Sequence, residues 1–426
     1  MVSNPAKNSR TIIETNSSSD KLSPWSSAST NAVKLPVGTT AQRPTAANGM
    51  IRLNTTTNQF EGYQNGNWQG LGGVIDVDQD TYVSTEKTSD DDTLFFYTAG
   101  EERAKIDSAG NTFISGDMTI SGAELGKITA GTLTLGDTTA STITVDGISS
   151  ANSSNISTVD LNASSITFAT GDSTFQGLTS TANTGAISGT VALTVAGTSS
   201  FTASGSNQSI ILSDTSNAFT GSVSFNTIGS SGDTNLVTNS ALTLGASAIG
   251  GDQSITVGGT SQTMNIAGTQ TVGGKITLQS SGDLTLTSSL ATSSTSDSAV
   301  SLTSTGGGIF DGDSDGSIDI QAASGGLVAV SNNGVGTTAN PIDTTLDSLD
   351  IVNSTGGDIN IYESDGLLIN RITQSVNDKD IAVSYSGSLI GESKATIPDD
   401  STGKITFNQR KQIVNTKDQI LENTGK

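Results

Sequence analysis

Pairs of apolar residues separated by one small polar residue recur along most of this chain. Each pair is followed by a turn rich in Gly, Asn, Asp or Ser, and most successive pairs lie about 8 to 13 residues apart. Because side chains alternate faces along a β-strand, each pair places two residues on one face and points the small polar residue the other way. The pattern therefore predicts many short strands with one apolar face. The pairs are Leu133/Leu135, Ile143/Val145, Ile166/Phe168, Leu193/Val195, Ile210/Leu212, Val223/Phe225, Leu242/Leu244, Ile255/Val257, Met264/Ile266, Ile276/Leu278, Leu284/Leu286, Val300/Leu302, Ile318/Ile320, Val328/Val330, Leu349/Ile351 and Ile359/Ile361.

The low apolar content predicts an elongated all-β fibre and argues against a globular domain. Only 33% of the residues are hydrophobic, against about 45–50% in globular chains, so a thick core is not expected. Two arrangements complete a thin core and hide the strand edges: turns stacked within one chain as a β-solenoid, or chains wound together as a trimeric β-prism. Proline is absent from position 45 through position 340, which suits a continuous ladder in either arrangement. The pattern leaves both open.

Charge and missing residue types exclude several functions. Residues 106–370 carry 22 acidic and 2 basic side chains, which accounts for -20 of the net charge of -22. A phosphate-binding surface needs clustered Lys or Arg, so we expect no nucleic-acid partner and no attraction to anionic lipid. Cys and His are absent, which excludes Ser/His/Asp and Cys/His catalysis and removes the usual zinc ligands. The first residues lack an apolar signal region, and no run is long enough to span a bilayer, so we expect synthesis in a cytoplasm without membrane insertion.

Composition divides the chain into four predicted regions. Residues 1–40, rich in Ser, Thr and Asn, predict an extended arm that orders on a partner. Residues 41–105 predict a small aromatic β-hairpin module, and residues 106–370 predict the repetitive β shaft. Residues 371–426 have balanced charge and predict a cap or tip, in which residues 409–422 form either a short helix or a frayed polar tail.

Aromatic and aliphatic residues gather in the predicted hairpin module around two turn-forming segments, residues 54–58 and 65–67. This spacing predicts a hairpin with an aromatic face. The side chains expected on this face are Ile51, Phe60, Tyr63 and Trp68. Such a face packs the hairpin itself and also offers a surface for attachment, and we expect it to do both.

Two segments near the N-terminus resemble the tail-fibre and other virion appendage proteins of tailed bacteriophages, marine ones especially. One comprises residues 35–44 (LPVGTTAQRP) and 48–63 (NGMIRLNTTTNQFEGY), closing on Trp68, and the other is residues 96–111 (FYTAGEERAKIDSAGN). Lys105 stands where the second segment usually has Arg. The resemblance covers about a tenth of the chain with good specificity, and it extends to β-helical adhesin repeats only through the composition of the shaft.

The resemblance implies a structural virion protein without catalytic residues. It implies a homotrimer that is assembled in the host cytoplasm, docks to other virion proteins through its N-terminus and extends a shaft toward a host surface receptor. A head, neck or baseplate fibre without a receptor role is an alternative within this class. A bacterial β-solenoid surface adhesin is an alternative outside it, which the missing secretion signal disfavours.

Acidic residues offer one candidate metal site. Residues 311–319 (DGDSDGSID) have the D-x-D-x-D-G spacing of a calcium loop, so Asp311, Asp313, Asp315 and Asp319 could converge on Ca²⁺. Position twelve of the loop is Ala322 instead of the usual bidentate Glu. The site would therefore bind weakly, in the millimolar range, and an acidic surface turn is the competing interpretation. No other cofactor is expected.

Paired carboxylates are the remaining route to catalysis, because a glycosidase works without histidine. Glu363/Asp365 and Asp399/Asp400 are the candidate pairs for a depolymerase. Sugar grooves are usually built with aromatic platforms and cationic side chains, and residues 106–361 contain no Trp or Tyr and only two Lys. The sequence therefore favours a protein that works by binding and reach, not an enzyme.

Overall fold

A computed structural model describes residues 34–410 except 65, 71–75, 77–79, 86, 89–90, 111, 115–117, 121–124 and 314. The chain forms two compact units, Met1–Tyr82 and Val83–Lys426, here called the N-terminal unit and the solenoid unit. Most of the predicted arm, residues 1–33, and most of the predicted C-terminal helix, residues 411–422, lie outside the described residues.

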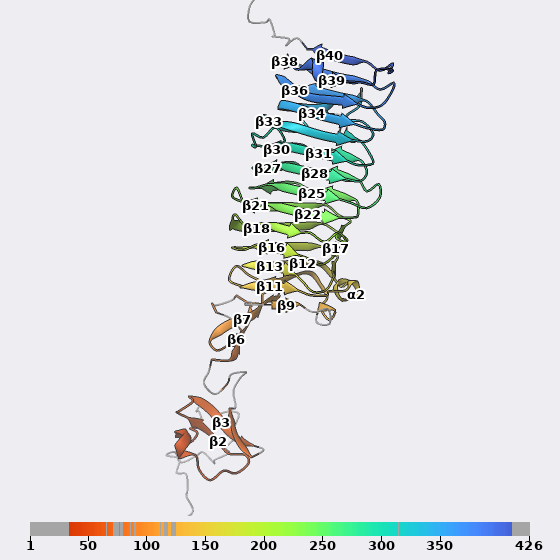
Figure 1. Ribbon diagram of the computed structural model, residues 1–426. Coiled ribbons are helices and arrows are strands. Elements are labelled where there is room, and N and C mark those ends of the chain that lie inside the picture. The colour runs from red at the N-terminus through yellow and green to blue at the C-terminus, as the bar shows by residue number, and fades with distance from the viewer. Residues whose placement is uncertain are drawn as a thin grey trace, which may run out of the picture. The chain divides into compact units, whose positions relative to one another are not determined.

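The N-terminal unit contains a four-stranded sheet in the order β1-β2-β3-β4 (Figure 1). β1 runs parallel to β2, whereas β2, β3 and β4 form two antiparallel hairpins. Asn58 and Gly66, in the two reversals, have positive φ of 53° and 83°, as tight hairpin turns require. Residues 51–70 therefore form two successive hairpins. The elements of the unit are β1 (Val37–Gly38), the 3₁₀ helix η1 (Thr40–Gln42), β2 (Ile51–Asn54), β3 (Gln59–Gln64) and β4 (Asn67–Gly70).

A second four-stranded sheet, in the order β5-β6-β7-β8, precedes the solenoid. β6 and β7 pair antiparallel across a two-residue turn in which Ala99 and Gly100 both have positive φ, the geometry of a tight hairpin. The predicted boundary at residue 105 falls inside β7. The strands are β5 (Tyr82–Ser84), β6 (Leu94–Thr98), β7 (Glu101–Ile106) and β8 (Thr112–Ile114).

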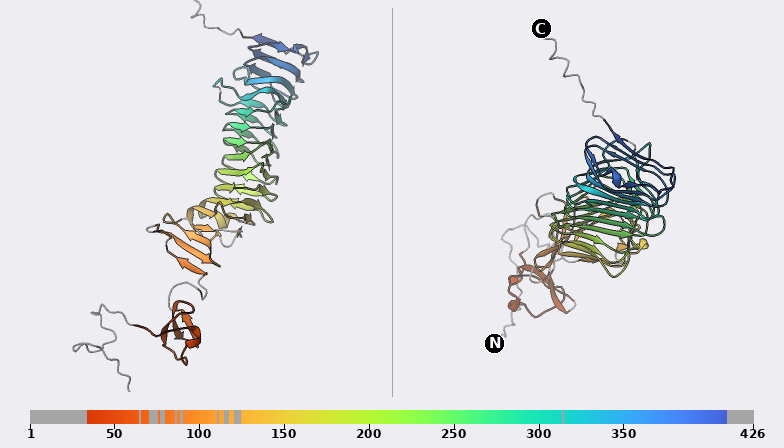
Figure 2. Two further views of the ribbon diagram at one scale, coloured as in Figure 1. Left: turned by 90° about the vertical axis from the view of Figure 1, so that its left-hand side faces the viewer. Right: turned by 45° about the horizontal axis from the view of Figure 1, so that its top comes forward.

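The rest of the solenoid unit is a parallel β-solenoid of about 13 turns (Figures 1 and 2). From β13 to β32 each turn contributes one strand to each of three stacks, which we name the first, second and third sheets in chain order. Of the two arrangements that the sequence left open, the structure has stacked turns within one chain. This confirms the prediction of an elongated all-β fold.

The strands of the three sheets are short. The first sheet contains β9 (Met118–Ile120), β11 (Thr142–Val145), β13 (Ser165–Phe168), β16 (Ile187–Gly189), β19 (Ile210–Leu212), β22 (Thr234–Thr238), β25 (Gln253–Val257), β28 (Ile276–Ser280) and β31 (Val300–Ser304). The second contains β14 (Ser173–Phe175), β17 (Leu193–Val195) and β20 (Ala218–Phe219), and, beyond a break in the pairing, β23 (Leu242–Leu244), β26 (Met264–Ile266), β29 (Leu284–Leu286) and β32 (Ile309–Asp311). The third contains β10 (Ala130–Gly136), β12 (Ile156–Ala163), β15 (Leu178–Ala182), β18 (Ser199–Ser206), β21 (Val223–Ile228), β24 (Ser247–Ile249), β27 (Gln270–Val272) and β30 (Leu290–Thr292).

The last turns use longer strands. β33 pairs with β30 of the third sheet and then with β31 of the first, so one strand continues across two sheets. Parallel pairing continues to β40, and the predicted boundary at residue 370 falls inside β36. These elements are β33 (Ile320–Ser331), β34 (Ile342–Asn353), β35 (Ile359–Glu363), β36 (Leu367–Gln374), β37 (Ile381–Tyr385), β38 (Leu389–Ile390), η2 (Glu392–Lys394), β39 (Ala395–Thr396) and β40 (Ile405–Gln409).

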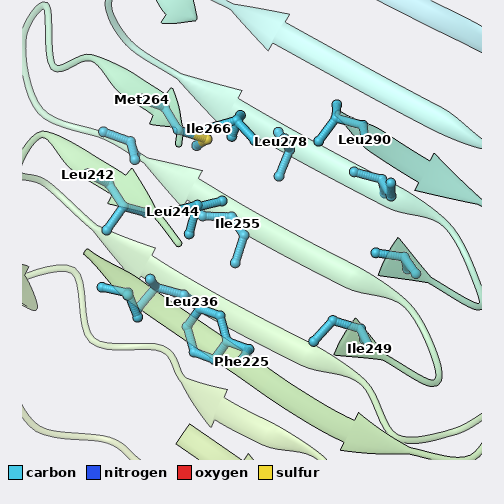
Figure 3. Packing of buried hydrophobic residues seen from close by; sticks show 14 of the residues in the cluster. Phe225, Leu236, Leu242, Leu244, Ile249, Ile255, Met264, Ile266, Leu278 and Leu290 are labelled. Carbon is cyan, nitrogen blue, oxygen red and sulfur yellow. The ribbon is translucent and has the colours of Figure 1, made fainter. Parts of the chain in front are cut away.

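The core is a continuous apolar column inside the turns. In the first sheet, Ile166 pairs with Ile187 and Ile187 with Ile210, so like side chains stack in a buried row. Figure 3 shows side chains from all three sheets meeting in this interior, among them Leu278, Met264 and Leu290. Most of the apolar pairs found in the sequence supply these inward positions.

One of the predicted pairs lies on the wrong face, and in a second, Ile318/Ile320, only Ile320 reaches the core. Val328 is half-buried and Val330 is exposed, while the neighbouring Leu327 and Ala329 point into the core. A one-residue change of register moves every side chain of a strand to the other face, and the choice between two apolar alternations cannot be made from the sequence of this strand alone. Ile318 likewise lies half-buried before β33 begins, and the neighbouring Asp319 is buried instead.

Glycines stack where successive turns bend closely over each other. A Cβ atom on Gly250 would lie 2.5 Å from the backbone of Gly229, and one on Gly273 would lie 2.3 Å from the Gly250 carbonyl oxygen. No larger residue fits these positions without moving the backbone of the turn before.

Helices are few and short. Besides the 3₁₀ helices η1 and η2, the described residues form the short helix α2 (Ser150–Ser153). No helix in the described part of the chain has the length and apolar character needed to cross a membrane.

Candidate functional site

Three aspartates from two successive turns form the main candidate site. Asp311 ends β32, Asp319 directly precedes β33, and Asp343 lies in β34. One carboxylate oxygen from each lies within 4.8 Å of the others. The Asp319 amide donates to the Asp343 carbonyl oxygen at 2.8 Å, and the Asp343 amide donates to Asp319 Oδ2 at 2.8 Å. The stacking of β33 and β34 thus fixes the Asp319 carboxylate against the backbone of Asp343.

Two of these carboxylates are buried. Asp319 is 4% exposed and Asp343 is 6% exposed, while Asp311 is half-buried. Loss of hydration disfavours the charged form, and it is the main cause that raises the pKa of Asp319 to about 8 and that of Asp343 to about 6. The negative charge of Asp311 raises both pKa values further. Burial therefore favours the neutral form of Asp319 and, to a smaller degree, that of Asp343.

The structure rearranges the calcium loop expected from the sequence. It brings Asp311 and Asp319 together but leaves Asp313 and Asp315 exposed on the turn between them. There the Asp313 carboxylate accepts from the Asp315 amide at 3.3 Å, and the Asp315 carboxylate accepts from the Ser317 amide at 2.7 Å. These two side chains therefore stabilise the turn and do not belong to the three-aspartate cluster.

Sequence reasoning missed Asp343, which lies 24 residues after Asp319. The separation is one turn of the solenoid: paired residues of the first sheet are 19 residues apart for Thr234 and Gln253, and 27 apart for Val300 and Leu327. A search for acidic residues one turn apart would have found Asp343. Such a search requires the number of residues in a turn, which the spacing of single strands does not give.

The candidate depolymerase residues do not share a cleft. Glu363 is fully buried; its carboxylate accepts from the Thr344 hydroxyl at 2.8 Å and from the amides of Leu346 and Asp365 at 3.3 and 3.2 Å. Burial raises the pKa of Glu363 to about 8. Asp365 is exposed on the following turn, so the two carboxylates do not flank a space that a sugar could enter.

Asp399 and Asp400, the other candidate pair, are adjacent in an exposed turn before β40. Side chains of neighbouring residues in such a turn do not face each other across a substrate. Neither pair has the geometry that a glycosidase needs.

The N-terminal unit has a polar interior. Arg52, Asn54 and Glu61 are buried on the facing sides of β2 and β3. The Glu61 carboxylate accepts from Arg43 Nη2 at 2.7 Å and from Asn54 Nδ2 at 2.9 Å, and it lies 3.5 Å from Arg52 Nε. Arg52 also donates to the Thr39 and Gln42 carbonyl oxygens. The Arg43 guanidinium lowers the pKa of Glu61 and keeps it ionised.

Apolar side chains lie on the opposite, exposed side of this sheet. Val37, Ile51 and Phe60 are 55%, 49% and 52% exposed. Val37 pairs with Leu53, and Leu53 with Phe60, so their side chains form one row across three strands. We call Val37, Ile51, Leu53 and Phe60 the apolar face.

The four predicted attachment residues divide between two sides of the sheet. Ile51 and Phe60 belong to the apolar face. Tyr63 and Trp68 pair across β3 and β4, with ring centroids 5.5 Å apart in an edge-to-face arrangement, and the Arg43 guanidinium lies 5.7 Å from the Trp68 ring. Trp68 and Ile51 also line a cleft of about 410 Å³. Its lining residues are Pro36, Val37, Gln42, Pro44, Met50, Ile51, Arg52 and Trp68.

Comparison with known proteins gives a match to the repeating part of the chain. A family described as repeats of unknown function (DUF5649) matches residues 153–226, which run from the end of α2 to β21. No curated protein and no solved structure matches the chain. The family match concerns about three turns of the solenoid.

Proposed function

We propose that this chain is a structural virion protein, a fibre of a tailed bacteriophage that docks to the particle by its N-terminal unit and reaches toward the host with its solenoid. The observation that carries this proposal is the combination of a long self-contained shaft with a separate small unit that exposes an apolar face. The shaft buries its own core turn by turn. The apolar face of the N-terminal unit has hydrophobic residues left over for a partner.

The resemblance of residues 35–63 and 96–111 to phage appendage proteins supports the same role. These residues form the hairpins of the N-terminal unit and the β6–β7 hairpin, which are the parts expected to contact other virion proteins. Repulsion between acidic side chains along the shaft keeps it extended and soluble. Its action is binding and reach, without catalysis.

Virion attachment is tested by substitutions on the apolar face. In phage that carry Ile51→Ser together with Phe60→Ser, we expect antibody labelling of the solenoid on purified particles to fall at least tenfold, since an apolar contact is lost. The matched control is Ile211→Ser in β19, which is 44% exposed on the shaft and should leave labelling unchanged. Full labelling of the double variant would contradict docking through this face, and no labelling of wild-type particles would contradict the virion role.

We also propose that the fibre is a homotrimer. The solenoid completes its core within one chain, so trimer contacts would join finished shafts and N-terminal units. Light scattering of the purified protein should then give three times the chain mass of 43.0 kDa. A mass of one chain would contradict the trimer but not the virion role. Labelling at the tail, head, neck or baseplate would decide between a receptor-binding fibre and the other appendages, and labelling of a bacterial surface in uninfected cells would favour an adhesin.

A further inference from the structure

We propose that Asp311, Asp319 and Asp343 bind one Ca²⁺ ion, which joins two successive turns of the solenoid. This site differs from the calcium loop that the sequence predicts, because one of its ligands comes from the next turn and two aspartates of the loop are not ligands. The proposal does not depend on the virion role.

The separation of the three oxygens suits Ca²⁺. Calcium binds carboxylate oxygens at about 2.3–2.6 Å, so two oxygens on one ion can be up to about 5 Å apart, whereas Mg²⁺ at about 2.0–2.1 Å draws them to within about 4.2 Å. The oxygens of Asp311, Asp319 and Asp343 lie within 4.8 Å of one another. They are therefore close enough to share one Ca²⁺ after small side-chain adjustments, and Mg²⁺, which demands a more regular geometry and gives up its water reluctantly, is disfavoured.

The Asp343 carboxylate is an independent sign that a ligand belongs here. The residue is 6% exposed, and no hydrogen bond from the described residues reaches its carboxylate. Its neighbours are acidic, and the negative charges of Asp311, Asp313 and Asp315 all raise its pKa. A buried carboxylate without a hydrogen bond or a cation is costly, and an ion between the three aspartates removes that cost.

No protein cation takes this place. Among the described residues, no Lys or Arg nitrogen lies within 4.0 Å of any of the three carboxylates. The Arg410 charge acts on Asp343, but its guanidinium lies over the Tyr362 ring, 4.6 Å from the centroid. The nearest positive group is thus engaged elsewhere.

The fold holds the ligands in position from both turns. Asp319 and Asp343 are linked by two backbone hydrogen-bond donors, and Asn340 Nδ2 donates to the Asp311 carbonyl oxygen at 3.0 Å. A bound ion would therefore clamp the loop from Asp311 to Asp319 onto β34. With three carboxylates and no bidentate Glu, we expect a dissociation constant of about 10⁻⁴–10⁻³ M, with water as the remaining ligands.

The test is titration calorimetry of the full chain, treated with EDTA, dialysed into chelator-free buffer and titrated with CaCl₂. Wild type should bind one Ca²⁺ per chain, and Mg²⁺ should bind more weakly. Asp343→Asn should weaken Ca²⁺ binding at least about tenfold because a charged ligand is lost. Asp315→Asn, which removes an exposed charge from the same turn, is the matched control and should change the affinity by less than about threefold.

The following results would contradict the calcium site. Absence of heat at about 10 mM CaCl₂, or wild-type affinity in Asp343→Asn, would overturn the proposal. Loss of binding in Asp315→Asn with retention in Asp343→Asn would assign the ion to the turn and overturn it equally. Circular dichroism checks the fold of each variant; if Asp343→Asn does not fold, Asp311→Asn, at the half-buried position, gives the same readout.

Discussion

The two units of this chain place polar and apolar side chains in opposite ways. In the solenoid, the inward positions of stacked strands carry rows of aliphatic residues such as Ile187 and Ile210, and the outward positions are mostly polar. In the N-terminal unit, the inward side of β2 carries Arg52 and Asn54, while Ile51 points outward. A solenoid gains stability from each added turn and needs no other protein for its core. The N-terminal unit instead buries polar side chains and exposes apolar ones, and this exposed face is where we propose that a partner docks.

The largest effect is expected from breaking the polar interior. Glu61→Ala leaves Arg52 buried without its carboxylate, which should destabilise the N-terminal unit by about 3–5 kcal/mol. Tryptophan fluorescence during urea unfolding reports on this unit, because Trp68 belongs to it. Gln69→Ala, at an exposed position on β4 of the same unit, is the control and should cost much less. Equal effects of the two substitutions would show that the interior network does not hold this unit together.

The next effect is expected in the solenoid core. Ile210 and Ile211 are neighbours in β19, one 0% and the other 44% exposed. Ile210→Ala should lower the free energy of unfolding by about 2–5 kcal/mol, because it leaves a cavity in a packed row. Ile211→Ala should change it by less than about 0.5 kcal/mol. Far-UV circular dichroism during urea unfolding measures both, and similar losses would contradict the assigned faces.

How far the fold follows from the sequence can be judged from individual strands. Pairs such as Ile276/Leu278 predict a strand and its buried face, because each is separated by a single polar residue and bounded by turns. In the segment from Leu327 to Val330 every residue is apolar, so the pattern does not predict which face of the strand is buried. The choice between stacked turns and wound chains also depends on pairing between residues some 20 positions apart, which local alternation does not encode.

The candidate site was predictable only in part. Asp311 and Asp319 follow from a local motif, so the sequence alone identified them. Asp343 joins them through the stacking of β34 on β33, whereas Asp313 and Asp315 stay exposed on the turn, where their carboxylates accept from its own amides. Local spacing does not show which of several nearby carboxylates the turn itself will use.

A smaller effect, dependent on pH, is expected from the buried Glu363. Its pKa is about 8 in the folded chain against an ordinary value of 4.5, so the unfolded chain ionises first as the pH rises. The free energy of unfolding should therefore fall between pH 4.5 and pH 8, by at most about 1.4 kcal/mol per pH unit from this one group. Asp319 and Asp343 act in the same direction, so the comparison needs a variant.

Glu363→Gln isolates that contribution. The variant should lose less stability than wild type between pH 5 and pH 8, measured by urea unfolding with EDTA present throughout. Asp399→Asn, in the exposed turn before β40, should keep most of the fall. An identical pH dependence in wild type and Glu363→Gln would mean that this carboxyl group is already ionised in the folded chain.

The smallest effect on stability is expected on the apolar face, and it is the one that separates the two units most clearly. Ile51→Thr keeps a β-branched residue at a position 49% exposed, so the free energy of unfolding of the isolated protein should change by less than about 0.5 kcal/mol. Val330→Thr, 37% exposed on the solenoid, is the matched control and should behave the same way in isolation. A loss from Ile51→Thr as large as that from Ile210→Ala would show that the face is already packed within the chain. If it is free, the two variants should differ only in virion attachment, because we propose that the partner covers the apolar face and not the position of Val330.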